Sequence, residues 1–198
     1  MFLEDWGNEA PELFVMLADG SDLELNIIRE SQLGQIEVGP IRSLLDRRGL
    51  LDDLHVPIRA PSRAELLEDL RRTLAWFWHD VGHLITAAGR SQTWWVAGQV
   101  EALRGYCVNL VRLEQGVRTN TEAYWKIDAE TSTDALEELR STFVGVDIEA
   151  MIDAASVLLA FFGTHGRRAA AAYGVAYPEE LERLMPRRLD DLVATRRA

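Results

Sequence analysis

A long apolar run between Ser62 and Gly116 constrains the fold more than any other part of the sequence. Its apolar side chains recur every three or four residues, the spacing of a helical face buried in a core. They are Leu66, Leu67, Leu70, Leu74, Phe77, Trp78, Val81, Leu84 and Ile85, then Trp94, Trp95, Val100, Leu103, Tyr106, Leu110 and Leu113. Because Gly89 and Arg90 interrupt the pattern, the run predicts two antiparallel helices joined by a short turn.

Residues at the expected helix ends support this interpretation. Ser62 is a good N-cap for the first helix, and Glu65 three residues later completes a capping box. Ser91 is the expected N-cap of the second helix. Gly116 is expected to end it, because glycine accepts the left-handed conformation found after many helices.

Three further helices are expected after this hairpin. The first begins at Ser132 or Thr133 and runs to about Phe143. The second begins at Asp147, and its apolar pattern allows it to continue to Tyr173, with a weak point at two glycines. The last follows Pro178 and covers residues 179–197. Five helices of this length predict a bundle.

The N-terminal part of the chain has the pattern of strands. Residues 13–17 are apolar, Asp19-Gly20 is a strong turn signal, and residues 22–27 alternate between polar and apolar side chains. Together they predict a β-hairpin, and residues 42–46 are a candidate for another short strand.

The predicted fold class is therefore α+β, a small N-terminal β-hairpin or sheet remnant followed by an antiparallel helical bundle of about five helices. The expected domains are residues 1–60 and residues 61–198. So small a sheet cannot stand alone in water, so it must lean on the helices or on another chain. Its unpaired edge is open to a homodimer or to a partner chain.

The net charge of -11 limits the partners that this protein can have. No basic surface is left for nucleic acid or anionic lipid, so we expect no nucleic acid and no membrane partner, whereas a small-molecule cation fits the charge. The single cysteine, Cys107, excludes an intramolecular disulfide and is expected to be buried. Because no targeting or membrane-spanning segment is visible, a cytoplasmic protein is expected.

Two histidines, His79 and His83, stand one helical turn apart on the first expected helix. This spacing suits two metal ligands, and Asp80 stands roughly where zinc proteases with a His-Glu-x-x-His motif carry their general base. Aspartate is shorter than glutamate, however, and the sequence shows no third ligand. We therefore expect both histidines to be structural or idle, with a metal-binding bundle as an alternative.

Two carboxylates, Asp22 and Glu24, alternate with Leu23 on the second expected strand, which places them on one face of the hairpin. Such a rigid pair can bind Mg²⁺. Pairs of this kind are also common on solvated strands, so the pattern alone leaves both interpretations open.

Several short motifs resemble the aminoglycoside nucleotidyltransferases, especially their 6-adenylyltransferase branch. In the N-terminal part they are Leu17-Ala18-Asp19-Gly20-Ser21-Asp22-Leu23-Glu24-Leu25-Asn26-Ile27-Ile28, Gly39-Pro40 and Leu44-Leu45-Asp46-Arg47-Arg48-Gly49. In the helical part they are Phe77-Trp78, Leu103-Arg104, Trp125-Lys126 and Tyr177-Pro178-Glu179-Glu180-Leu181. The resemblance covers most of the chain, although each motif is short.

The resemblance implies a polymerase-β-like nucleotidyltransferase domain followed by a bundle that helps to bind the substrate. In this family a Gly-Ser loop and an Asp-x-Asp strand hold Mg²⁺ and ATP, and a third carboxylate lies on a later strand. Aligned on the Asp-Gly turn, Glu24 takes the third position and is the expected catalytic residue. Asp22 and Glu24 are the expected metal ligands, and Lys126 is the expected cofactor-binding residue.

The first two family motifs would lie before Leu13, where the sequence has neither. A rival alignment takes residues 21–25 as the Asp-x-Asp strand itself. It places strand-like residues 13–17 where the family has a helix and the Gly-Ser loop, and it leaves residues 39–49 unexplained. We therefore prefer the first alignment, which implies that the catalytic half is missing.

A groove beside the helical hairpin is expected to bind the ligand, because aromatic faces and carboxylates suit polycationic sugars. The candidate residues are Trp94, Trp95, Glu101, Tyr124 and Trp125, with at least one of the first two expected to lie in the core instead. We expect a nucleotidyltransferase-like protein without autonomous catalysis that binds a cationic small molecule. The alternative is an active nucleotidyltransferase of small molecules, and only this alternative requires Mg²⁺ and ATP.

Overall fold

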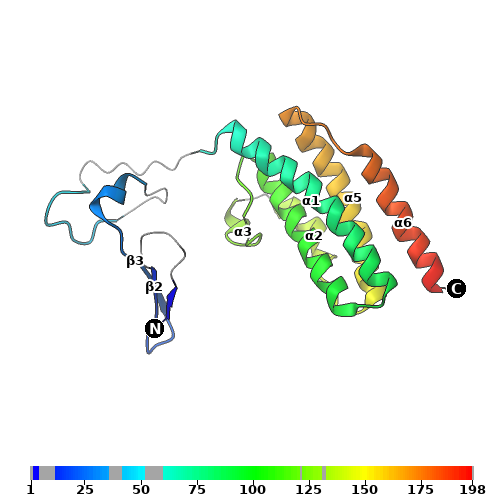
Figure 1. The fold of residues 1–198 in the computed structure, drawn as a ribbon, viewed down its shortest axis with the longest axis horizontal. Helices are drawn as coiled ribbons and strands as arrows, with labels where there is room; N and C mark the ends of the chain where they lie inside the picture. Colours follow the sequence, from blue (N-terminus) through cyan, green and yellow to red (C-terminus); the bar gives the residue numbers. More distant parts are fainter. Residues whose placement is uncertain are drawn as a thin grey trace. The chain divides into compact units, whose positions relative to one another are not determined.

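The computed structural model describes residues 2–4, 12–35, 42–51, 60–120, 122–130 and 133–197. The chain divides into two compact units, Met1–Ala60 and Pro61–Ala198. The first unit carries a small antiparallel sheet, and the described elements of the second are helices (Figure 1). The predicted α+β class, a small sheet followed by a helical bundle, is confirmed.

Three antiparallel strands in the order β1-β2-β3 make up the sheet of the N-terminal unit, namely β1 (Phe2–Glu4), β2 (Glu12–Met16) and β3 (Asp22–Asn26). The predicted hairpin is the pair β2 and β3. Its turn is closed where the backbone N–H and hydroxyl of Ser21 donate to the Asp19 carboxylate, at 3.0 and 2.6 Å. These hydrogen bonds lower the pKa of Asp19. A short 3-10 helix, η1 (Glu30–Gln35), follows β3.

The third strand of this sheet is not the one that the sequence predicted. It is β1, which pairs with β2, whereas residues 42–46 form no strand. The Asp46 carboxylate there accepts hydrogen bonds from the backbone N–H groups of Arg48, at 3.1 Å, and Leu51, at 2.7 Å. An aspartate that binds the backbone just after it favours a turn over a strand, and this explains the difference.

Four long helices lie side by side in the helical unit (Figure 1), and they are α1 (Arg63–Gly89), α2 (Thr93–Glu114), α5 (Ile148–Tyr173) and α6 (Glu179–Arg197). Two short helices, α3 (Ile127–Glu130) and α4 (Thr133–Arg140), belong to the connection between α2 and α5. The long helices correspond to four of the predicted five, and α4 is the fifth. The short helix α3 falls in a segment that the sequence indicated to be irregular.

The helix ends follow the sequence signals in part. Ser62 and Glu65 form the predicted capping box, with the Ser62 N–H donating to Glu65 Oε2 at 2.8 Å. The N-cap of α2 is Gln92 instead of Ser91. Ser91 adopts a positive φ of 54°, and its N–H bonds back to the Ala88 carbonyl, so this residue ends α1 instead of starting α2.

The core of the bundle is centred on aromatic rings from α1 and α5. Phe77 and Phe162 are stacked with their ring centroids 3.6 Å apart, and Trp78 meets Phe162 edge-on at 5.8 Å. None of the three side chains is exposed. Cys107 is also fully buried, as predicted, and burial raises the pKa of its thiol.

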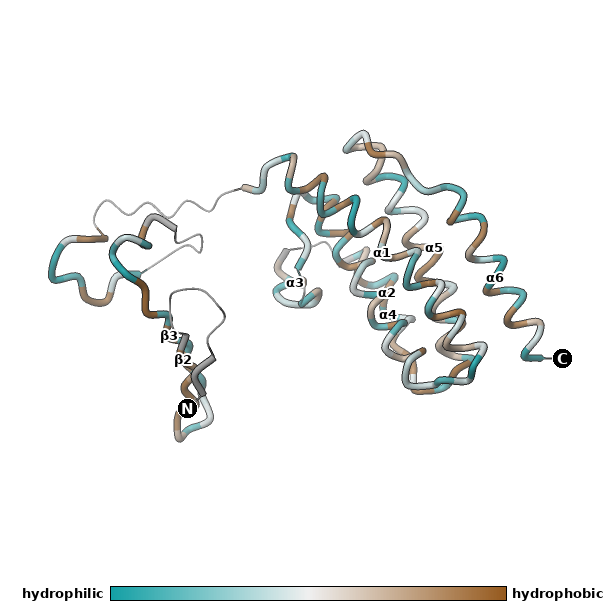
Figure 2. The backbone as a smooth tube through the Cα atoms, in the orientation of Figure 1, coloured by the Kyte–Doolittle hydropathy of each residue, from teal (hydrophilic) through white to brown (hydrophobic). Residues whose placement is uncertain are grey.

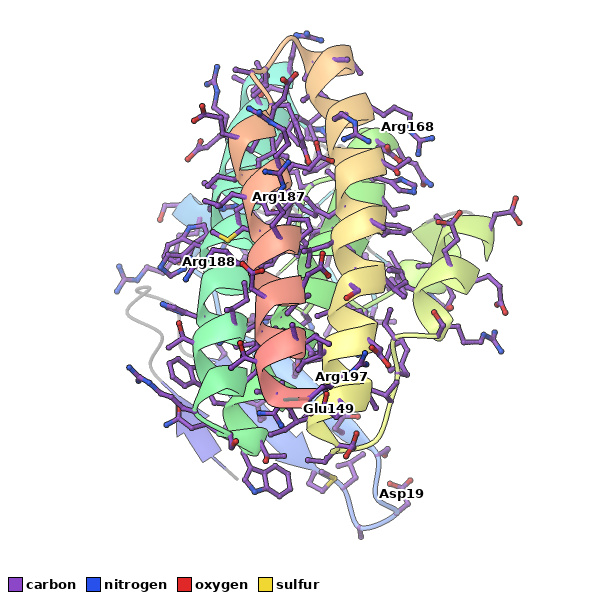
Figure 3. All side chains as sticks on the ribbon, turned by 90° about the vertical axis from the view of Figure 1, so that its right-hand side faces the viewer. Asp19, Glu149, Arg168, Arg187, Arg188 and Arg197 are labelled. Carbon is purple, nitrogen blue, oxygen red and sulfur yellow. The ribbon has the colours of Figure 1, made fainter. Side chains whose placement is uncertain are left out.

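The outer helix α6 carries many hydrophilic residues (Figure 2). Arg187, Arg188 and Arg197 are exposed on it (Figure 3). Arg196 instead joins three helix ends, because its Nε donates to Glu149 Oε1 at 2.9 Å and its guanidinium donates to the Ala88 carbonyl at 2.8 Å. Charged contacts thus hold the end of α6 against the start of α5 and the end of α1.

Helix α5 is the one helix in the described ranges that is long and apolar enough to cross a membrane. Its most apolar window is 56% buried within the bundle, and the core helix of a bundle passes the same test of length and composition. The sequence was expected to contain no membrane-spanning segment, and the structure shows that α5 runs through Gly163 and Gly166 as one continuous helix. This property alone does not place the protein in a membrane.

The glycines of α5 allow close packing instead of interrupting the helix. A Cβ on Gly166 would lie 2.9 Å from the ring of Tyr177, which is closer than van der Waals contact allows, and 3.4 Å from Leu74, at the short edge of ordinary contact. Tyr177 belongs to the segment that connects α5 to α6. The missing side chain at Gly166 therefore lets this segment pack on α5.

Substituting Gly166→Ala is expected to lower the free energy of unfolding by about 1–2 kcal/mol, because overpacking outweighs the better helix propensity of alanine. The matched control is Gly82→Ala in α1, where nothing lies within 4 Å of the added methyl group. We expect the control to stabilise the protein slightly. Urea denaturation of both variants measures the two effects, and equal stabilisation by both would show that the packing at Gly166 is not tight.

Candidate ligand-binding site

A pocket of about 1050 Å³ lies between α1, α2 and the segment that follows α2. Its walls carry four aromatic side chains and two carboxylates, which are Trp76, Tyr106, Tyr124, Trp125, Glu101 and Glu122. The other lining residues are Arg72, Thr73, Gly98, Ala102, Gly105, Asn109, Thr119, Asn120 and Ala123. Its size lies at the upper end of the range for pockets that bind drug-sized molecules.

Polar side chains of α2 fix the aromatic wall of this pocket, which is the wall that carries Tyr124 and Trp125 in the segment after α2. Asn109 binds the backbone of Asn120 twice, because its amide nitrogen donates to the carbonyl at 3.0 Å and its amide oxygen accepts from the N–H at 2.9 Å. One turn further on, the buried guanidinium of Arg112 donates to the carbonyls of Ala123, at 3.3 Å, and Trp125. The aromatic wall therefore has a fixed backbone, although it lies outside the long helices.

A buried carboxylate on α1 fixes the start of the same segment. Asp69 accepts hydrogen bonds from Arg118 Nε at 3.0 Å and from the Thr119 N–H at 3.3 Å, and it pairs with Arg72 at 2.7 Å. Burial acts to raise the pKa of Asp69, but the hydrogen bonds and positive charges of these partners outweigh it, so the net shift is downward. Asp69 is therefore a buried, charged side chain that holds the start of the segment after α2 against α1.

The carboxylate of Glu101 is held at one edge of the pocket. It forms an ion pair with Arg104, whose side chain is buried and also donates to the Thr142 hydroxyl at 2.8 Å. Tyr124 lies close to both charged groups, and its pKa rises to about 12, mainly because of burial. Glu101 remains 54% exposed, so it can still meet a ligand in the pocket.

One aromatic residue of the pocket, Trp125, contacts a cation. The Lys126 ammonium lies 3.9 Å from the centroid of the Trp125 ring. Trp125 itself is half-exposed. This contact shows that the Trp125 ring can hold a cation at cation–π distance, and Lys126 itself does not line the pocket.

The structure gathers some of the predicted binding residues and separates others. Glu101, Tyr124 and Trp125 all line the pocket, whereas Trp94 and Trp95 do not. Trp94 is on the same helical stripe as Glu101 but seven residues earlier, which is about 10 Å along the axis. The expectation that at least one of these two tryptophans lies in the core is wrong, because they are 79% and 37% exposed.

Sequence reasoning missed two aromatic residues of the pocket, Trp76 and Tyr106. Trp76 lies off the apolar stripe of α1, and a large aromatic residue off a buried stripe is a sign of an exposed binding surface. Gly98 and Gly105 also line the pocket, seven residues apart on α2. Their spacing places both on one face of the helix, where small residues leave room for a ligand.

The two predicted metal ligands of the N-terminal unit, Asp22 and Glu24, lie on β3 as the alternation of polar and apolar residues predicted. Register pairs Asp22 with Met16 and Glu24 with Phe14, so both carboxylates share one face of the sheet. All five residues of β3 are exposed. The roles of Asp22, Glu24 and Lys126 in binding Mg²⁺ and ATP remain predictions.

Comparison with known proteins supports the fold. No protein-family model and no curated protein matches the sequence. The structure is similar to the crystal structure of an aminoglycoside 6-adenyltransferase from Bacillus subtilis, with a TM-score of 0.57 and 14% sequence identity. The match covers 96% of this chain and 73% of that chain. Likeness at this identity concerns the fold alone, which is nucleotidyltransferase-like.

Proposed function

We propose that the pocket of the helical unit binds a small organic cation of the amino-sugar class, and that this chain does not transfer nucleotides unaided. The observation that supports the first part most is the combination of an accessible tryptophan face and carboxylates in one pocket. Lys126 already places an ammonium group on Trp125. Glu122 is exposed and forms no ion pair within the described part of the chain.

The class of ligand follows from the shape and charge of the pocket. A sugar ring that carries ammonium groups can stack on an aromatic face while its charges meet carboxylates. The net charge of -11 adds a long-range attraction for any cation. The neighbour in fold is named for acting on an aminoglycoside, which is a ligand of this chemistry.

Trp125→Ala is expected to weaken the binding of a cationic aminoglycoside about tenfold, because a desolvated cation–π contact contributes on the order of 1–2 kcal/mol. Trp94→Ala is the matched control, since it removes an exposed tryptophan outside the pocket. Titrations followed by tryptophan fluorescence and by calorimetry measure both affinities. Wild-type protein that binds no member of an aminoglycoside panel, or equal losses in the two variants, would contradict the proposal.

The second part of the proposal rests on the chemistry of nucleotidyl transfer. This reaction depends on positioning and on neutralising phosphate charge with metal ions. The resemblance gives Glu24 the third carboxylate position, and the sequence before Leu13 contains no Gly-Ser loop or Asp-x-Asp pair. Asp22 and Glu24 alone supply only part of a metal site.

An active Mg²⁺- and ATP-dependent nucleotidyltransferase is the second candidate, favoured by the shared face of Asp22 and Glu24. Incubation of the protein with Mg²⁺, labelled ATP and the aminoglycoside panel distinguishes this candidate from the proposed binding function. We expect no transfer of label. Transfer that is abolished by Glu24→Gln, and retained in Glu30→Gln, would establish the enzyme instead.

A further inference from the structure

Helix α1 brings two imidazoles and a carboxylate together on the bundle surface. His79 and His83 have ring centroids 4.3 Å apart, and Asp80 Oδ1 lies 2.8 Å from His79 Nδ1 and 3.8 Å from His83 Nδ1. One candidate ligand atom from each residue lies within 4.8 Å of the others. The carboxylate thus reaches both histidines, although the sequence suggested that no third ligand was available.

These separations suit a transition metal ion. Zinc binds imidazole nitrogen and carboxylate oxygen at about 2.0–2.2 Å, which places neighbouring ligand atoms roughly 3.3 Å apart in a tetrahedral site. The three groups therefore need only small side-chain rotations. Two imidazoles and one carboxylate form a donor set that suits divalent zinc, nickel and copper.

The carboxylate is oriented before any metal binds. Tyr106, on the neighbouring helix α2, donates its hydroxyl proton to Asp80 Oδ2 at 2.9 Å. The other oxygen of Asp80 faces the two histidines. Asp80 is mostly buried, with 14% of its side chain exposed, whereas the histidine side chains are about half exposed at 49% and 46%. Hydrogen bonds to metal-binding carboxylates serve this positioning role in metal sites.

We propose that His79, Asp80 and His83 bind a divalent first-row transition ion of the zinc, nickel and copper class. The exposed imidazoles form the outer side of the site, and one coordination position faces solvent. Tyr106 is a positioning residue that acts through Asp80. The metal site adjoins the cation pocket, because Tyr106 lines that pocket and donates to Asp80, but neither histidine lines it.

Calorimetric titration of the untagged, chelator-treated protein with Zn²⁺ tests the proposal. We expect one ion per chain, and a loss of affinity of at least about 100-fold in His79→Ala or His83→Ala. Tyr106→Phe removes the hydrogen bond that orients the Asp80 carboxylate and is expected to lose about tenfold. Asp80→Asn replaces a charged ligand by a neutral amide and is expected to lose at least as much. Glu68→Gln is the matched control, since it removes an exposed carboxylate of α1 that lies outside the cluster.

A second readout uses the rings beside the cluster. Trp76 lies 4.9 Å from His79, and Trp95 lies 5.8 Å from His83, so bound Cu²⁺ should quench their fluorescence. Saturable quenching that disappears in His83→Ala, with unchanged circular dichroism, supports the site. The proposal is overturned if the wild type binds no Zn²⁺ at millimolar concentration, or if Asp80→Asn binds as tightly as the wild type.

Discussion

Replacing Arg112 with methionine is expected to lower the free energy of unfolding by about 3 kcal/mol, because each buried carbonyl that loses its donor costs roughly 1–3 kcal/mol. The side chain is 2% exposed and donates to the carbonyls of Ala123 and Trp125. Methionine fills much of the same space but offers no donor. The segment that carries the aromatic wall should therefore loosen.

The same substitution is expected to weaken ligand binding, because Tyr124 and Trp125 depend on this backbone for their position. The control is Arg140→Met, which breaks an ion pair with Glu137 whose two side chains are 78% and 64% exposed. An exposed pair of this kind contributes at most about 1 kcal/mol. Urea denaturation and aminoglycoside titration measure both variants, and equal losses of stability would show that Arg112 has no special role.

The sequence predicted the helices well because their signals are local. The capping box of Ser62 and Glu65 and the apolar spacing of α1 depend on residues at most four positions apart. The continuation of α5 through Gly166 was also predicted, but its reason was not, because Tyr177 approaches that glycine through tertiary packing. Local pattern thus predicts that a helix exists, whereas packing determines why a particular residue is tolerated.

The candidate site was predicted less completely because its parts come from distant segments. Asp69 and Arg112 lie on apolar stripes of α1 and α2, and their partners belong to the irregular segment after α2. No periodicity predicts such contacts. Asp80 was considered only as a possible base for zinc chemistry, since sequence spacing does not show that its carboxylate reaches both histidines.

The remaining large effect concerns the buried carboxylate at the start of the same segment. Asp69→Asn is expected to lower the free energy of unfolding at pH 7 by about 2–3 kcal/mol, the range for hydrogen bonds to a charged group. The substitution keeps the shape of the side chain but removes the charge that Arg118 and Arg72 face. Because these arginines are 49% and 54% exposed, water compensates them in part, which keeps the loss below that of a fully buried pair.

The dependence of this loss on pH identifies its electrostatic origin. The pKa of Asp69 in the folded protein lies below its ordinary value of 3.8, so near that pH the unfolded chain binds more protons than the folded one. The contribution of the Asp69 charge to the free energy of unfolding is therefore fully present above pH 3.8. It is lost as the pH falls through the pKa that Asp69 has in the folded protein. Glu114, whose pKa is also lowered, titrates alike in wild type and variant, so the difference between them isolates Asp69.

Urea denaturation at neutral and acidic pH should show the two proteins converging in acid, with the exposed Asp153→Asn variant close to wild type throughout. A difference between wild type and Asp69→Asn that stays constant with pH would mean that the asparagine disturbs packing, and that the charge of Asp69 does not anchor the pocket wall.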